Sequence, residues 1–192
     1  MAKKYEFQPD KPYSNWLNKL QLTRQQRKQV LKWGLYALLL ILLSVLQDVV
    51  LCRVRLFGGT TDLVPCGIFI ICIMEGTQQS CVFSLASSFL YLLSGVSPGS
   101  HVLILITALA MLAAAIRQTY LRPSLLSTLL ATLFAMALYE LAVFAFCLLL
   151  GKVSADRLVA FLIPAGLSVV VVPIVYPIAK TICTIGGTAW KE

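Results

Sequence analysis

The sequence predicts an all-α integral membrane protein, a compact bundle of about six transmembrane helices in a single domain. Of its 192 residues, 59% are hydrophobic and only 12% are charged, so a soluble domain would expose more apolar surface than water tolerates. The apolar residues form long runs separated by short polar segments, and several runs are long enough to cross a bilayer. Lipid is therefore the expected solvent for most of the chain.

Positive charge is concentrated at the start of the chain. Residues 1–32 carry eight Lys and Arg side chains against Glu6 and Asp10, and the whole chain has a formal net charge of +8. We predict a basic cytoplasmic arm over residues 1–32 that is attracted to anionic lipid, a six-helix transmembrane domain over 33–182 and a short cytoplasmic tail over 183–192. No nucleic-acid partner is expected, because the arm has no nucleic-acid-binding motif and leads directly into an apolar run.

The spans follow in order. Residues 33–51 would make a helix of about 28 Å, which matches the hydrocarbon core. The apolar block 63–93 is too long for one span and is interrupted by the polar residues 75–79, so it predicts two short spans joined by a turn. Residues 63–74 alone reach only about 18 Å, and they extend toward Gly58, thin the bilayer or form a re-entrant segment.

Three further spans complete the predicted bundle, over residues 101–116, 124–150 and 158–180, and Pro173 and Pro177 should kink the last one. With the N-terminus inside the cell, twelve Lys and Arg residues lie on the cytoplasmic side and four lie outside. The positive-inside rule therefore favours a multipass protein of the bacterial plasma membrane with both termini in the cytoplasm.

Glu140 is the foremost functional candidate, because it lies near the middle of the predicted fifth span, where a charge is expensive. With its neighbour Tyr139 it predicts an intramembrane polar contact. Two roles remain open: a structural clasp between helices, which is the commoner role of such a residue, or direct contact with a ligand. Gln47 and Asp62, near the outer ends of the first two spans, are further candidates for polar contacts, although ordinary capping explains them too.

A stripe of polar, mostly small residues runs along the predicted third span. Its members recur at helical spacing and should face protein; they are Ser80, Ser84, Ser87, Ser88 and Tyr91. Helix packing is the expected role, with a substrate-lining face as the alternative. No catalytic, cofactor-binding or metal-binding pattern is found, and the six cysteines lack the spacing of a zinc site, so the sequence does not predict an enzyme.

Short motifs in the same order resemble the MreD family of small multipass membrane proteins. The motifs are Leu46-Gln47, Thr61-Asp62-Leu63, Leu92-Leu93-Ser94-Gly95, Tyr139-Glu140-Leu141 and Pro173 through Tyr176-Pro177. Gln47, Asp62 and Glu140 match polar positions of that family.

The resemblance implies a non-enzymatic membrane subunit of the bacterial cell-elongation machinery that helps to regulate rod shape. Such proteins associate with the partner subunit MreC and couple the MreB cytoskeleton to peptidoglycan synthesis. The family's architecture is thought to resemble the six-helix substrate-binding subunits of energy-coupling vitamin transporters. A subunit of that transporter class is the alternative function, in which Glu140 would contact a ligand.

Overall fold

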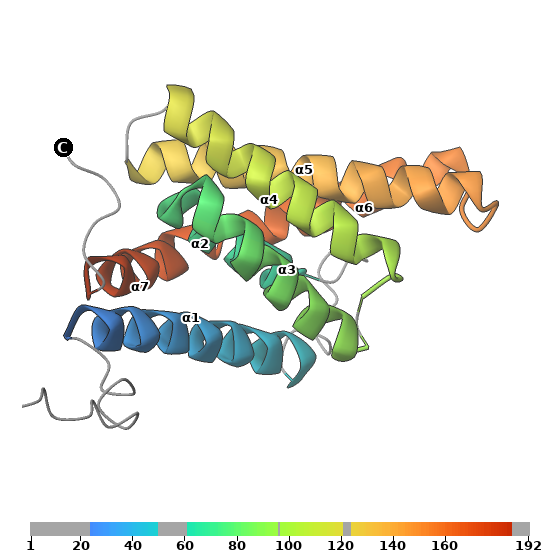
Figure 1. Ribbon diagram of the computed structural model, residues 1–192. Coiled ribbons are helices and arrows are strands. Elements are labelled where there is room, and N and C mark those ends of the chain that lie inside the picture. Colours follow the sequence, from blue (N-terminus) through green and yellow to red (C-terminus); the bar gives the residue numbers. More distant parts are fainter. Residues whose placement is uncertain (1–23, 50–60, 96, 121–123, 186–192) are drawn as a thin grey trace, which may run out of the picture.

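The computed structural model describes residues 24–49, 61–95, 97–120 and 124–185, and this part of the chain is helical without strands (Figure 1). The helices are α1 (Arg24–Val49), α2 (Leu63–Glu75), α3 (Thr77–Leu93), α4 (His101–Tyr120), α5 (Leu125–Leu149), the 3₁₀ turn η3 (Ala155–Arg157), α6 (Leu158–Val169) and α7 (Val172–Ile185). The prediction of an all-α protein is confirmed.

Helix α2 forms the centre of the bundle. All 13 of its residues are buried, and it packs against α1, α3, α4, α5 and α7. Figure 1 shows it between α1 on one side and α4 and α5 on the other. Its length is about 20 Å, which is shorter than the hydrocarbon core of a bilayer. A helix that is apolar all round must be covered by other helices or by lipid, and in this bundle other helices cover α2.

The turn between α2 and α3 consists of one residue, Gly76, and not of the five residues 75–79 that the sequence suggested. Gly76 has φ +91°, a conformation that L side chains rarely adopt, and a Cβ there would collide with the side chain of Gln118. Across this turn the Ser80 hydroxyl lies 2.7 Å from the Cys72 carbonyl oxygen, so it can hydrogen-bond to α2. The hairpin is therefore tight and held by its own polar atoms.

Three helices are long and apolar enough to cross a membrane: α1, α4 and α5. Helices α6 and α7 together make a fourth candidate, bent by 49° where the chain passes from one to the other. Six spans were expected, but α2 has 13 residues and α3 has 17, so neither reaches the length of these candidates. The described residues thus contain three or four candidate spans.

The bend in the last span lies directly before Pro173, the second residue of α7. A proline cannot donate the backbone hydrogen bond that would continue α6, which accounts for the break at this point. Pro177 lies within α7, which continues through it to Ile185. The predicted proline bend is therefore found at Pro173, and a kink at Pro177 stays a prediction.

The first helix starts nine residues earlier than the predicted span, at Arg24, so residues 24–32 are helical and continuous with that span. Arg27 and Lys28 are exposed, but Lys32 is buried. Residues 1–23 of the predicted arm and 186–192 of the predicted tail lie outside the described residues.

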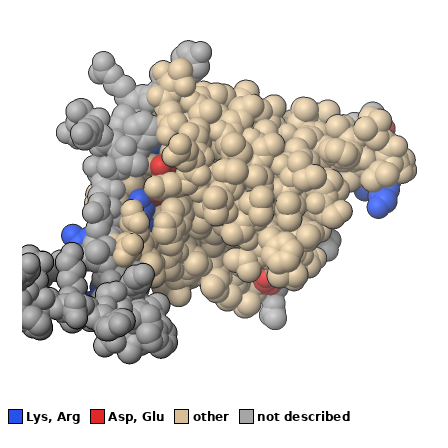
Figure 2. Space-filling model, in the orientation of Figure 1, with Lys and Arg blue, Asp and Glu red and all other residues tan. Residues whose placement is uncertain are grey.

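The outer surface of the bundle is mainly apolar. Figure 2 shows a face that is almost entirely tan, with a few blue and red atoms near its margins. Large aliphatic side chains such as Leu38, Val82, Ile104 and Leu126 are more than half exposed. Such a continuous apolar surface is typical of a protein that lipid surrounds.

Candidate functional site

Five polar side chains meet at the N-terminal end of α2. Gln47 comes from α1, Asp62 directly precedes α2, Tyr91 comes from α3, and Tyr139 and Glu140 come from α5. We call this group the Asp62 cluster. Apart from Asp62, which is partly buried, its members are at most 4% exposed. The structure therefore brings together all four candidates for intramembrane polar contacts and adds Tyr91 from the serine stripe.

Two side chains from other helices cap the start of α2. The Gln47 Oε1 atom accepts a hydrogen bond from the backbone N–H of Val64 at 3.0 Å. The Ser168 hydroxyl oxygen, on α6, accepts one from the backbone N–H of Asp62 at 2.9 Å. The first N–H groups of a helix have no partner within the helix, so these bonds replace the usual local cap. The Asp62 carboxyl group makes no capping bond to α2 itself, so it is available to interact with other side chains.

The carboxyl groups of Asp62 and Glu140 are close enough to hydrogen-bond to each other. Such a bond requires a proton on one of the two groups, because two ionised carboxylates offer only acceptors. Burial raises the pKa of Asp62, and the bond to Glu140 partly opposes this rise. The pair therefore resembles a carboxyl dyad that holds one proton.

The two tyrosines stand beside this pair. The Tyr139 side chain interacts electrostatically with Tyr91, Asp62 and Glu140 and packs edge-on against the Phe69 ring of α2, with ring centroids 6.5 Å apart. The Glu140 Oε1 atom is buried without a partner of hydrogen-bonding geometry among the described residues, and the Tyr139 hydroxyl lies beside that of Tyr91. Unpaired buried polar atoms cost about 1–3 kcal/mol each, so a native fold keeps them only for a reason.

The serine stripe of α3 is buried along its whole length. Ser84 lies near the Cys81 carbonyl within its own helix, at 3.2 Å, and Ser88 reaches across to the Thr107 hydroxyl of α4, at 3.3 Å. Helices α3 and α4 form an extensive contact. Small hydroxyl residues let two helices approach closely, which fits Ser88 at its contact with α4, whereas Ser87 lines the groove described below.

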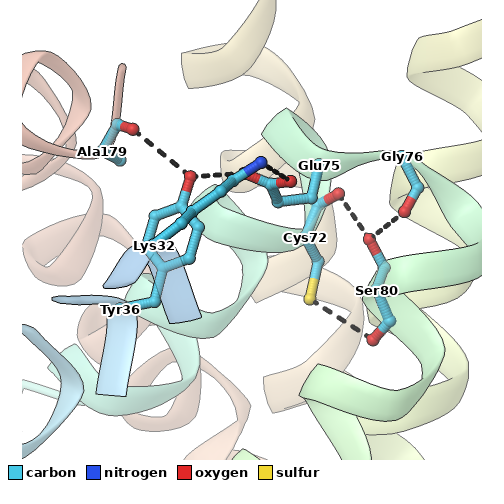
Figure 3. A network of polar contacts seen from close by, with 7 residues as sticks. All are labelled: Lys32, Tyr36, Cys72, Glu75, Gly76, Ser80 and Ala179. Carbon is cyan, nitrogen blue, oxygen red and sulfur yellow. Dashed lines mark hydrogen bonds and ion pairs between the residues drawn. The ribbon is translucent and has the colours of Figure 1, made fainter. Parts of the chain in front are cut away.

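A second polar group, which the sequence analysis missed, lies at the C-terminal end of α2. Figure 3 shows Lys32 and Tyr36 of α1 pointing toward Glu75. Lys32 Nζ forms an ion pair with Glu75 Oε2, and the Tyr36 hydroxyl donates to Glu75 Oε1 at 2.5 Å. We call these three residues the Glu75 cluster. The lysine and carboxylate side chains are only 5% and 1% exposed.

Arg117 of α4 completes this end of α2. One of its guanidinium nitrogens, Nη1, donates to the Ile73 carbonyl oxygen at 2.6 Å, and the residue is only 3% exposed. The last carbonyls of a helix have no partner within it and carry partial negative charge, so a cation there is favourable. Both ends of α2 are thus held by side chains from neighbouring helices.

The Glu75 cluster left a weak signal in the sequence. Lys32 and Tyr36 are four residues apart, so they share one face of a helix, and Leu39, Leu40 and Leu43 continue that buried face. Because the sequence analysis placed Lys32 in the N-terminal arm and Glu75 in a turn, it did not predict that these two opposite charges form an ion pair. Their pairing depends on the position of α1 beside α2, which is a tertiary feature.

An apolar groove of about 510 Å³ runs between α1 and α3. The two helices touch at only a few positions, because α1 packs mainly on α2 and α7. The groove is lined from α1 by Trp33, Ala37 and Leu40 and from α3 by Gln78, Gln79, Val82, Phe83, Ala86, Ser87 and Leu90. A smaller hollow of about 180 Å³ adjoins it and reaches Tyr91. The described residues contain no group of three or more His, Cys, Asp or Glu that could hold a metal ion.

Comparison with protein-family models, with curated proteins and with solved structures finds no match for this chain. The groove and the two polar clusters are therefore the physical basis for a functional proposal.

Proposed function

We propose that this protein is a non-enzymatic membrane subunit of the bacterial cell-elongation machinery, similar to MreD, and that it acts by helix contacts within the membrane. In this function it binds an MreC-like subunit and other membrane proteins of the elongation complex. The assembly links the cytoskeleton to peptidoglycan synthesis and so helps to regulate cell shape. The family motifs and the apolar surface of the bundle support this proposal.

The observation that carries the proposal is the groove between α1 and α3. Ala37 and Ala86 lie on its two sides, and small residues let a third helix approach the backbones closely. Gln78 and Gln79 at one end offer amide groups to polar atoms of a partner. A groove with an apolar floor and a polar end fits a transmembrane helix that begins at the membrane interface.

The proposal includes six passes, counting α2 and α3 as two short passes and the bent pair of α6 and α7 as one. Because α1 would then start in the cytoplasm, the Glu75 cluster lies toward the cytoplasmic side and the Asp62 cluster toward the outside. Exposed Arg27 and Lys28 would lie beside anionic lipid headgroups. Single cysteines at Ala2, Ser97 and Ala189 on a cysteine-free background test this topology in intact cells. Only the Ser97 site should react with an impermeant reagent, and reaction of either terminal site would refute the arrangement.

Filling the groove tests the function directly. Replacing Ala86 with Phe should abolish copurification of the MreC-like subunit and make a rod-shaped host round or wide at normal protein abundance. Ala160→Phe is the matched control, because Ala160 is an exposed helical alanine on α6, which does not line the groove. Normal shape and copurification with the Ala86→Phe variant would contradict the proposal. Loss of vitamin uptake at normal cell shape on depletion would favour a transporter subunit instead.

A further inference from the structure

Among the described residues, the Asp62 cluster contains more acid than its surroundings can neutralise. Facing the two carboxyl groups are Gln47 from α1, Tyr91 from α3 and Tyr139 from α5, and all three side chains are uncharged at neutral pH. Ser168 from α6 and Cys66 on α2 also lie at this end and carry no charge. The buried cations of the described residues, Lys32 and Arg117, bind the opposite end of α2, about 20 Å away.

Two ionised carboxylates in contact are unstable in such a place, because they repel each other and each has lost water. One negative charge is tolerable, since the pair lies at the N-terminal end of α2, where the helix dipole is positive. One proton between the two groups therefore balances the site. It converts one acceptor into a donor and so allows a hydrogen bond between Asp62 and Glu140, whose carboxyl groups lie within reach of each other.

A proton fits this site better than a metal ion. A sodium ion needs several oxygen ligands around it, whereas the carboxyl groups of Asp62 and Glu140 are close enough to hydrogen-bond to each other. A proton requires no additional volume. The buried Glu140 Oε1 atom can accept a hydrogen bond when the proton moves or leaves.

We propose that Asp62 and Glu140 form a proton-binding site that locks the N-terminal end of α2 against α5. When the site is deprotonated, the O–H bond of the acid breaks, its electron pair stays on oxygen and the proton passes to water. The two carboxylates then repel each other, and the lock opens. Gln47 and Ser168 bind the same end of α2, so its movement is transmitted to α1 and α6. This inference does not depend on which partner occupies the groove.

Infrared spectroscopy of the purified full-length protein in detergent detects the proton. The carbonyl stretch of a protonated carboxylic acid, which shifts in heavy water, should be present at about pH 7 in the wild type and absent from Glu140→Gln. Asp48→Asn is the control, because Asp48 is exposed on α1 beside Gln47. Its spectrum should keep the band. A wild type without the band, or a band that persists in Glu140→Gln, would overturn the proposal.

Thermal unfolding gives an independent measure. The folded protein keeps a proton that the unfolded chain releases, so stability should fall as pH rises above about 5. One proton corresponds to a fall in the unfolding temperature of roughly 3–5 °C per pH unit. The fall should be lost in Glu140→Gln and kept in Asp48→Asn.

A metal ion in place of the proton would give a different result. Sodium would then stabilise the wild type more than potassium does at fixed pH, and this difference would be absent from Glu140→Gln, which would refute the proposal. If Glu140→Gln does not fold, titration of the wild-type infrared band decides alone: the band should disappear as pH rises, and an invariant spectrum would refute the site.

Discussion

The buried ion pair between Lys32 and Glu75 allows a quantitative test of how α1 is held to the bundle. Lys32→Met keeps most of the side-chain volume but removes the ammonium group, which leaves the Glu75 carboxylate buried with only uncharged donors beside it, the Tyr36 hydroxyl and the Cys183 thiol. Since both charged side chains are at most 5% exposed, solvent cannot screen the loss. Breaking a buried pair in this way costs about 3–5 kcal/mol.

The assay is thermal unfolding of the purified protein in detergent, followed by near-UV circular dichroism. For a chain of this length, that cost lowers the unfolding temperature by roughly 6–20 °C. Lys28→Met is the matched control, because Lys28 lies one turn earlier on α1 and is exposed. The double variant Lys32→Met with Glu75→Gln should recover part of the loss, since no charge remains unpaired. Equal unfolding temperatures for the Lys32 and Lys28 variants would refute the reasoning.

Three other substitutions test single contacts by the same unfolding assay. Tyr36→Phe removes one charge-assisted hydrogen bond to Glu75 and should lower the free energy of unfolding by about 1.5–3 kcal/mol, less than Lys32→Met does. A cost equal to or larger than that of Lys32→Met would contradict this ranking. Gln47→Ala removes the cap at Val64 and should cost about 1–2 kcal/mol, and no change would show that this cap is dispensable. Gly76→Ala should destabilise by about 1–2 kcal/mol, because its positive φ is strained for a residue with a Cβ and the Gln118 side chain would have to move; an unaltered or higher unfolding temperature would refute the strained turn.

The sequence was informative wherever local rules decide the structure. The predicted fifth span, residues 124–150, matches α5, and Ser124 caps it by accepting a hydrogen bond from the Ser127 N–H at 3.2 Å. Glu140 stood out because an acidic residue is rare near the middle of an apolar run, and Asp62 was identified as a polar residue near the outer end of the second predicted span. Their meeting could not be deduced, since it depends on how α2 and α5 pack.

The features that the sequence did not reveal depend on tertiary contacts. Hydropathy alone cannot distinguish a helix that faces lipid from one that other helices enclose, so the complete burial of α2 could not be predicted. In the same way, an acidic residue at a turn looks solvated until a lysine from another helix is seen to reach it. Glu75 was missed for this reason.

Photo-crosslinking in living cells tests the central claim, that the groove between α1 and α3 receives a helix of the elongation machinery. A photoreactive amino acid at Ala86 should crosslink to the MreC-like subunit, whereas the same group at Ala160 on α6 should not. Crosslinking to that subunit from Ala86 alone is the predicted result. Crosslinks from Ala86 only to lipid, or equal crosslinking to the subunit from both positions, would contradict the claim.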